Sequence, residues 1–156
     1  MKVITFESKR IEKKNLNLLM DISHNKQLQF INMTYMNEDF DEKKKILIEL
    51  NKKINGYKQQ DIKKNIHDAD TLINKDDLIE KLVESKLKCK YCKNNIYIFF
   101  KHSREKEQWT LDRIDNNEAH TNDNTVISCL KCNLERRTKD YDIYIFSKQL
   151  KIKKTE

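Results

Sequence analysis

The sequence predicts an α+β protein, in which a mainly helical N-terminal region precedes a smaller module of short strands and one helix. Two observations indicate this division. Up to residue 88, apolar residues recur every three or four positions, as in helices that bury one face. Beyond residue 88, short β-prone runs alternate with polar loops, and four cysteines form two closely spaced pairs. We therefore expect a helical region over 1–88, a module over 89–139 and a basic C-terminal extension over 140–156.

Two helices are predicted before the cysteines. The first begins at Asp41, which can cap it, and ends before Gly56, the only glycine, after the apolar residues Ile46, Leu47, Leu50 and Ile54. The polar, basic stretch 57–64 follows, and it fits a solvated helix better than a nucleic-acid-binding arm. The second helix is capped by Asn74 and has one apolar face, formed by Leu78, Ile79, Leu82 and Val83.

The sequence pattern of the second half is typical of a small β-containing module. The predicted order is strand, strand, polar loop, strand and helix, at residues 96–100, 109–114, 115–124, 125–128 and about 130–139. Trp109 is expected to pack in the core rather than to stack on a base. Residues 141–146 fit either a strand or a terminal helix, and periodicity does not decide between them.

Composition limits the classes of function. Charged and hydrophobic residues each make up 37% of the 156 residues, so only a modest core is expected. The net charge of +7 permits a polyanionic partner, but it fits a solubilising Lys-rich surface equally well. No apolar run is long enough to span a membrane, and the N-terminal residues lack a signal-peptide pattern. We therefore expect an intracellular protein in a reducing compartment, without a membrane partner.

The four cysteines form two C-x-x-C pairs, Cys89 with Cys92 and Cys129 with Cys132. In a reducing compartment such pairs indicate metal ligands before disulfides. Four thiolates suit a tetrahedral Zn²⁺ site with no open coordination position, so we predict a structural zinc. The alternative is a set of reduced thiols or a redox pair. The spacing between the pairs exceeds that of an ordinary zinc ribbon, so an extra element is expected between them.

The segment between and after the pairs contains two linked motifs. Asp112-Arg113-Ile114-Asp115-Asn116 ends a predicted strand, and Cys129-x-x-Cys132-Asn133 opens a predicted helix. With these motifs the sequence resembles the HNH (ββα-metal) endonuclease family, and most closely a zinc-containing subgroup in phage and large DNA viruses. The resemblance covers residues 89 to about 138. It implies a zinc-stapled ββα-metal module that hydrolyses DNA phosphodiester bonds with a divalent metal.

The resemblance also implies roles for individual residues. Asp112 takes the place of the first ligand of the catalytic metal, and Asn133 takes the place of the second. Asn124 corresponds to the residue that ties down the loop through hydrogen bonds. Oxygen ligands suit Mg²⁺ or Mn²⁺, and no organic cofactor is expected. In the family, water attacks phosphorus and leaves 5′-phosphate and 3′-hydroxyl ends.

One position departs from the family pattern. The histidine that follows the aspartate as general base in the family is replaced by Arg113, and a guanidinium accepts no proton at neutral pH. Arg113 is instead expected to bind a phosphate oxygen. His120 in the loop is then the candidate base. Tyr91, His102 or water activated by the metal itself are further options.

Basic residues around the motif predict contacts to a phosphate backbone. The expected nucleic-acid-binding residues are Arg104, Arg113, Lys131, Arg136, Arg137 and Lys139. The expected partner is DNA, with RNA as an option, and the module alone is expected to have low sequence specificity. Two alternatives remain open: a catalytically inactive zinc-containing nucleic-acid-binding protein, and a zinc-containing protein-interaction or transcription-accessory domain. The sequence does not indicate an oligomeric state.

Overall fold

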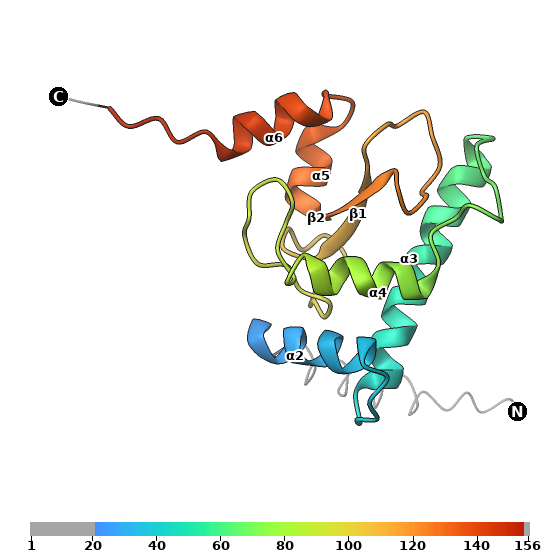
Figure 1. Ribbon diagram of the computed structural model, residues 1–156. Coiled ribbons are helices and arrows are strands. Elements are labelled where there is room, and N and C mark those ends of the chain that lie inside the picture. The colour runs from blue at the N-terminus through green and yellow to red at the C-terminus, as the bar shows by residue number, and fades with distance from the viewer. Residues whose placement is uncertain (1–20, 155–156) are drawn as a thin grey trace, which may run out of the picture.

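The computed structural model describes residues 21–154 as an α+β structure, which confirms the predicted class (Figure 1). Its elements in chain order are α2 (His24–Tyr35), α3 (Lys43–Lys63), α4 (Lys75–Glu84), β1 (Trp109–Arg113), β2 (Thr125–Cys129), α5 (Leu130–Arg136) and α6 (Tyr141–Gln149). Residues 1–20, which include the stretch compared with signal peptides, and residues 155–156 lie outside this description. No helix within 21–154 combines the length and the apolar character needed to cross a membrane.

The helix at 75–84 forms as the sequence predicts. The Asn74 side chain accepts a hydrogen bond from the Asp77 backbone N–H at 2.9 Å, which satisfies one of the free donors at the start of α4. Leu78 and Leu82 on its inner face are fully buried. Helix α2 packs beside α4. His24 Nε2 of α2 lies 2.9 Å from the carbonyl oxygen of Leu87, which follows the end of α4. These contacts fix the segment that leads into the first cysteine pair.

The long helix α3 does not end at Gly56, so that prediction is wrong. It begins after Glu42, with no side-chain cap from Asp41, and it continues to Lys63. Asn65, with φ 58°, supplies the left-handed residue that closes the helix. The extra turns persist because Tyr57 and Asp61 on them are buried by the rest of the fold, and such packing outweighs the local cost of a helical glycine.

The β-prone residues 96–100 form no regular strand, which is a second correction. Ile96, Ile98 and Phe99 are buried and Tyr97 and Phe100 are half-buried, but the backbone N–H groups find partners other than a neighbouring strand. Ile98 and Phe99 donate to the Gln27 side chain of α2, at 2.8 and 3.2 Å. Tyr97 makes only an isolated bridge with Gln108. The buried side-chain amide of Gln27 therefore accepts the N–H groups of Ile98 and Phe99, which a neighbouring strand would otherwise bind.

The strands β1 and β2 form an antiparallel pair that leads directly into α5. Trp109 lies opposite Cys129, and Arg113 lies opposite Thr125. Helix α5 begins at the residue after β2 and packs against both strands. The observed order is thus strand, loop, strand and helix. The stretch 141–146, for which sequence left two options, belongs to helix α6.

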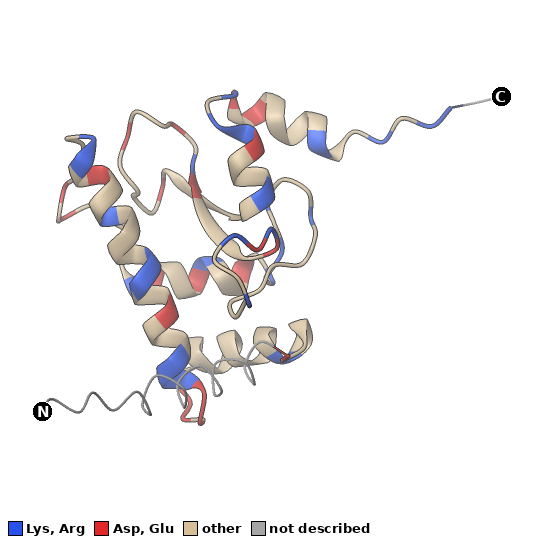
Figure 2. Ribbon diagram, turned by 180° about the vertical axis from the view of Figure 1, so that it is seen from behind, with Lys and Arg blue, Asp and Glu red and all other residues tan. Residues whose placement is uncertain are grey.

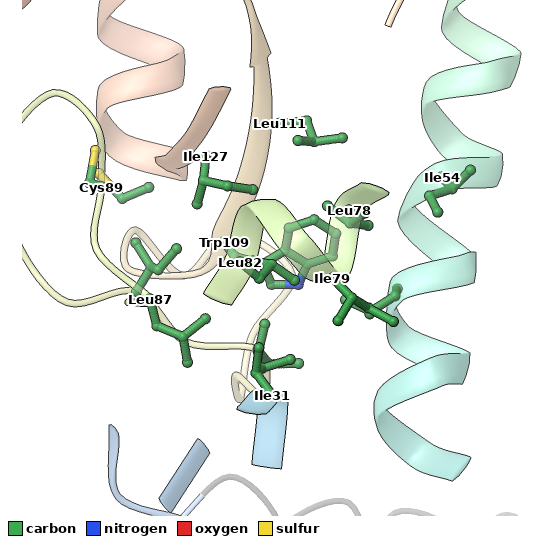
Figure 3. Packing of buried hydrophobic residues seen from close by; sticks show 14 of the residues in the cluster. Ile31, Ile54, Leu78, Ile79, Leu82, Leu87, Cys89, Trp109, Leu111 and Ile127 are labelled. Atoms are coloured by element: carbon green, nitrogen blue, oxygen red, sulfur yellow. The ribbon is translucent and has the colours of Figure 1, made fainter. Parts of the chain in front are cut away.

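The apolar residues form one cluster that crosses the expected boundary at residue 88. Figure 3 shows α2, α3, α4 and the strand pair around this apolar cluster. The cluster residues labelled in the figure are Ile31, Ile54, Leu78, Ile79, Leu82, Leu87, Cys89, Trp109, Leu111 and Ile127. Trp109 is fully buried, in agreement with the expected core role. Lys53 of α3 donates to the Trp109 carbonyl oxygen and lies over the indole ring. The helical region and the strands therefore share a core.

Candidate metal centre and adjacent site

The four cysteines come together although 37 positions separate the two pairs. Their Sγ atoms all lie within 4.8 Å of one another, and Cys92 Sγ is 3.9 Å from Cys129 Sγ. A tetrahedral zinc site with Zn–S bonds of about 2.3 Å has sulfur atoms about 3.8 Å apart. Three of the four side chains are buried and Cys92 is half-buried. The cluster is therefore compatible with a zinc ion, as the spacing predicts.

Backbone contacts hold each pair in place. The first cysteine turn, residues 88–93, follows α4, and the Lys90 N–H donates to the Ile127 carbonyl oxygen of β2 at 2.9 Å. The second pair spans the junction between β2 and α5, where Cys129 Sγ accepts a hydrogen bond from the Cys132 N–H at 3.3 Å. The contact with β2 holds the first cysteine pair, and the start of α5 holds the second, so that the four Sγ atoms lie close together.

The thiols influence one another strongly. Hydrogen bonds from Cys129 and Cys132 lower the pKa of Cys89, while bonds to Cys129 and Cys89 raise the pKa of Cys132. One thiolate is thus stabilised by neighbours that remain protonated, because several negative charges at this separation repel one another. A divalent cation would remove this restriction and allow all four sulfurs to ionise.

Helix α6 covers the first cysteine turn. The Tyr144 ring lies edge-on to Tyr91, with 4.9 Å between ring centroids. The Gln149 side chain donates to the carbonyl oxygens of Lys90 and Tyr91, both at 3.1 Å. The basic C-terminal extension thus contains a helix, one of the two options that the sequence left open for 141–146, and this helix packs on the cysteine turn.

Asp112 is buried at the interface between β1 and α5. Its Oδ2 accepts hydrogen bonds from the Tyr91 hydroxyl at 2.5 Å and from Arg136 Nη1 at 2.9 Å. Burial and the bond to Asp112 raise the pKa of Tyr91, so this hydroxyl acts as a donor and is poorly suited to be a base. No hydrogen bond within residues 21–154 uses Asp112 Oδ1.

Asn133 lies on the same interface. Its Nδ2 donates to Thr110 Oγ1 at 3.1 Å and to the Leu111 carbonyl oxygen at 3.3 Å. Thr110 and Asp112 share one face of β1 because side chains alternate along a strand. Asn133 and Arg136 share one face of α5 because they are three residues apart. The structure thus brings Asp112 and Asn133 to one strand–helix interface, and in the described chain Asn133 Oδ1 accepts no hydrogen bond.

Asn124 makes the loop contacts that the resemblance implies. Its Oδ1 accepts from the Asp115 N–H at 2.9 Å, and its Nδ2 donates to the carbonyl oxygens of Asp115 and Ala119, at 2.9 and 3.0 Å. These three bonds close the loop between β1 and β2 around one buried amide. Asn124 therefore shapes the end of β1 that carries Asp112.

His120 is buried and held by a residue that the sequence analysis did not identify. Asp61 of α3, with no exposed surface, accepts from the His120 backbone N–H at 2.9 Å, and its Oδ1 lies 2.6 Å from His120 Nδ1. Arg113 Nη1 is 4.0 Å from the same oxygen and donates to the Glu118 carbonyl oxygen at 3.2 Å. Asp61 thus joins the N-terminal helical region to the loop and to the end of β1.

The surroundings of His120 favour the neutral imidazole. Burial lowers the pKa of His120, and the hydrogen bond to Asp61 opposes this only in part. Its ring stacks on Tyr57, with centroids 4.6 Å apart. No hydrogen bond in the described chain uses His120 Nε2. His102, the other candidate histidine, is exposed on the loop before β1.

One signal in the sequence points to Asp61. It follows Leu50, Ile54 and Tyr57 at helical spacing, so it continues the buried stripe of α3 as a carboxylate. Because the sequence predicts that the helix ends at Gly56, Asp61 is not expected to lie on its buried face.

The predicted phosphate-binding residues divide into two groups. Arg104, Lys131, Arg137 and Lys139 are exposed. Arg113 and Arg136 are buried, and Arg136 donates to Asp112 and to the carbonyl oxygens of Arg113, Ile114 and Lys139. The guanidinium of Arg136 is therefore part of the strand–helix interface and not of the exposed cationic surface.

Comparison of the chain with protein-family models, with curated proteins and with solved structures finds no match. The resemblance to HNH endonucleases therefore rests on the motif residues of this chain.

Proposed function

We propose that this protein is a metal-dependent endonuclease of the HNH type that hydrolyses DNA phosphodiester bonds. The arrangement of Asp112 and Asn133 carries the proposal. Each side chain is anchored at the β1–α5 interface through one polar atom, Oδ2 of Asp112 and Nδ2 of Asn133. Each retains one oxygen that no hydrogen bond of residues 21–154 occupies. Two preoriented oxygen ligands are what a hard divalent cation requires from a protein.

The donor set fits Mg²⁺ or Mn²⁺, because one carboxylate and one amide oxygen leave positions for water and a phosphate oxygen. When bound, such an ion polarises the phosphate and stabilises the leaving oxygen. The zinc centre, which Asp112 and Asn133 do not join, serves a structural role in this proposal. Cys132 precedes Asn133 directly, so the sulfur cluster fixes the start of the helix that presents the amide.

The proposal assigns proton abstraction to His120. A neutral imidazole whose Nδ1 donates to Asp61 presents a basic Nε2 in a defined orientation. Asp61 acts as a positioning residue, since it holds both the backbone and the ring of His120. Arg113 contributes positive charge beside this pair and supports the loop through Glu118.

A nicking assay on supercoiled plasmid with Mg²⁺ or Mn²⁺ tests the proposal. Asp112→Ala and Asn133→Ala should each abolish cleavage. The matched changes Asp123→Ala and Asn117→Ala, at exposed positions of the loop between β1 and β2, should retain it. Zinc content and melting temperature measured on each variant separate loss of activity from loss of structure. Equal cleavage by Asp112→Ala and the wild type would overturn the proposal.

One observation favours a second candidate, a nucleic-acid-binding protein without catalysis. Asp112 Oδ2 is committed to Arg136 and Tyr91, and Arg113 occupies the position of the family's general base. An ion pair at this carboxylate reduces its net charge and so weakens its attraction for a cation. Salt-sensitive binding to DNA, with no cleavage in either metal, would support this second candidate.

A further inference from the structure

A hollow with a volume of about 390 Å³ lies between α4, the first cysteine turn and β2. Four lysines line it, Lys81, Lys88, Lys90 and Lys93, and Glu84 is the one acidic residue of its wall. None of these lysines belongs to the set that the sequence analysis selected for nucleic-acid binding. We call this hollow the lysine groove.

The lysine groove differs from the rest of the charged surface because three of its lysines lie on the first cysteine turn. Basic residues occur on most elements, including successive turns of α3, so positive charge alone selects no face (Figure 2). In the groove, however, Lys88, Lys90 and Lys93 alternate with the zinc ligands of the first cysteine turn. The N–H of Lys93 donates to the Cys89 carbonyl oxygen at 3.0 Å. The backbone that carries these three lysines would be locked by metal binding, and such preorganisation lowers the entropy lost on binding.

The groove also borders the proposed catalytic strand. Its floor contains three residues of β2, and these pair in the sheet with the end of β1: Thr125 with Arg113, Val126 with Asp112, and Ile127 with Leu111. Neighbouring strands lie about 4.8 Å apart. A ligand in the groove is therefore one strand away from Asp112. Lys81 Nζ donates to the Thr125 carbonyl oxygen at 3.0 Å, which places a fourth cation at this floor.

We propose that the lysine groove binds the phosphate backbone of duplex DNA and thereby positions the strand for the site at Asp112. The inference rests on the proposed function for the identity of the ligand. Exposed lysine ammonium groups interact with phosphates as point charges and release the counterions bound to DNA. A contact of this kind is independent of base sequence.

Fluorescence anisotropy of a labelled DNA duplex, titrated with the zinc-loaded full chain at several salt concentrations, tests the inference. The test variant is Lys88→Gln/Lys90→Gln/Lys93→Gln. The control variant, Lys44→Gln/Lys45→Gln/Lys52→Gln, removes the same charge from exposed positions of α3. The slope of log affinity against log salt should fall by about 1 for each lysine that contacts a phosphate. For three contacts the affinity at about 0.1 M salt should fall on the order of a hundredfold.

The control should bind as the wild type does, and both variants should retain zinc. If the groove variant keeps the wild-type affinity and salt slope while the wild type binds DNA, the inference is wrong and the proposed nuclease function is unaffected. If binding depends on the groove but no plasmid cleavage occurs, the groove is upheld and the nuclease function fails. If the wild type does not bind DNA, both are wrong.

Discussion

The Oδ1 atom of Asp61 lies 2.6 Å from Nδ1 of His120, which joins a helix of the N-terminal region to the loop between β1 and β2. The same carboxylate accepts the backbone N–H of His120. A histidine in a flexible loop would sample many orientations, whereas this one is fixed at both its backbone and its ring. The helical region therefore supplies a structural part of the proposed catalytic site.

Replacement of Asp61 should alter the pH dependence of cleavage. The hydrogen bond from His120 to Asp61 raises the pKa of His120, against the larger lowering effect of burial. Asp61→Asn should therefore move the acidic limb of the pH–rate profile to lower pH and reduce kcat. Asp68→Asn, an exposed change just beyond α3, is the control. His120→Ala removes the proposed base and should lower kcat by about 10²–10⁴-fold. If Asp61→Asn left the pH–rate profile unchanged, Asp61 would not position His120.

The burial of His120 also has a consequence for stability. Because its pKa is lowered in the folded protein, the unfolded chain binds more protons between that lowered value and about 6.5. The free energy of unfolding should therefore decrease as pH falls through about 6.5. Thermal melts at several pH values should show this decrease in the wild type and a smaller one in His120→Asn. Identical pH dependence in the two proteins would contradict a buried neutral imidazole.

The pair formed by Arg136 and Asp112 predicts a strong coupling. Arg136→Met removes the cationic partner and leaves a buried carboxylate, which should reduce the free energy of unfolding by roughly 3–5 kcal/mol. The second change Asp112→Asn should restore part of that loss, because no unpaired charge remains. Arg137→Met, at the next and exposed position, should have little effect. Additive losses in the double variant, measured by denaturant unfolding, would show that the two side chains do not interact.

Loss of a zinc ligand should destabilise the second half of the chain. The wild type should bind one zinc ion, and Cys129→Ser or a strong chelator should lower the melting temperature by more than an ordinary surface substitution does. Asn94→Ser changes an exposed side chain next to the first cysteine turn and should keep both the metal and the stability. Metal analysis and thermal melts are the measurements. Full stability of the metal-free protein would rule out a structural zinc.

The parts of this fold that sequence predicts are those set by local chemistry. Asn74 caps α4 through its own side chain, and the C-x-x-C spacing brings two sulfurs together within each turn. The loop role of Asn124 follows from a motif whose hydrogen bonds lie within ten residues. Each of these depends on few residues that are close in the chain.

The parts that sequence does not predict depend on distant partners. Residues 96–100 form no strand, because Gln27, about 70 positions earlier, accepts the N–H groups of Ile98 and Phe99. Helix α3 passes Gly56 because Tyr57 and Asp61 pack against the loop that contains His120. Arg136 looks like a surface cation in the sequence, yet it fills its donors with Asp112 and three carbonyl oxygens. Only the folded chain reveals these pairings.

A crystal structure of the zinc-loaded protein soaked in Mn²⁺, with anomalous scattering to identify each ion, would show whether Asp112 and Asn133 bind one metal ion together. We predict zinc on the four sulfurs and a separate manganese ion bonded to an oxygen of Asp112 and the amide oxygen of Asn133. Manganese that occupies other sites, with Asp112 bonded only to Arg136 and Tyr91, would contradict it.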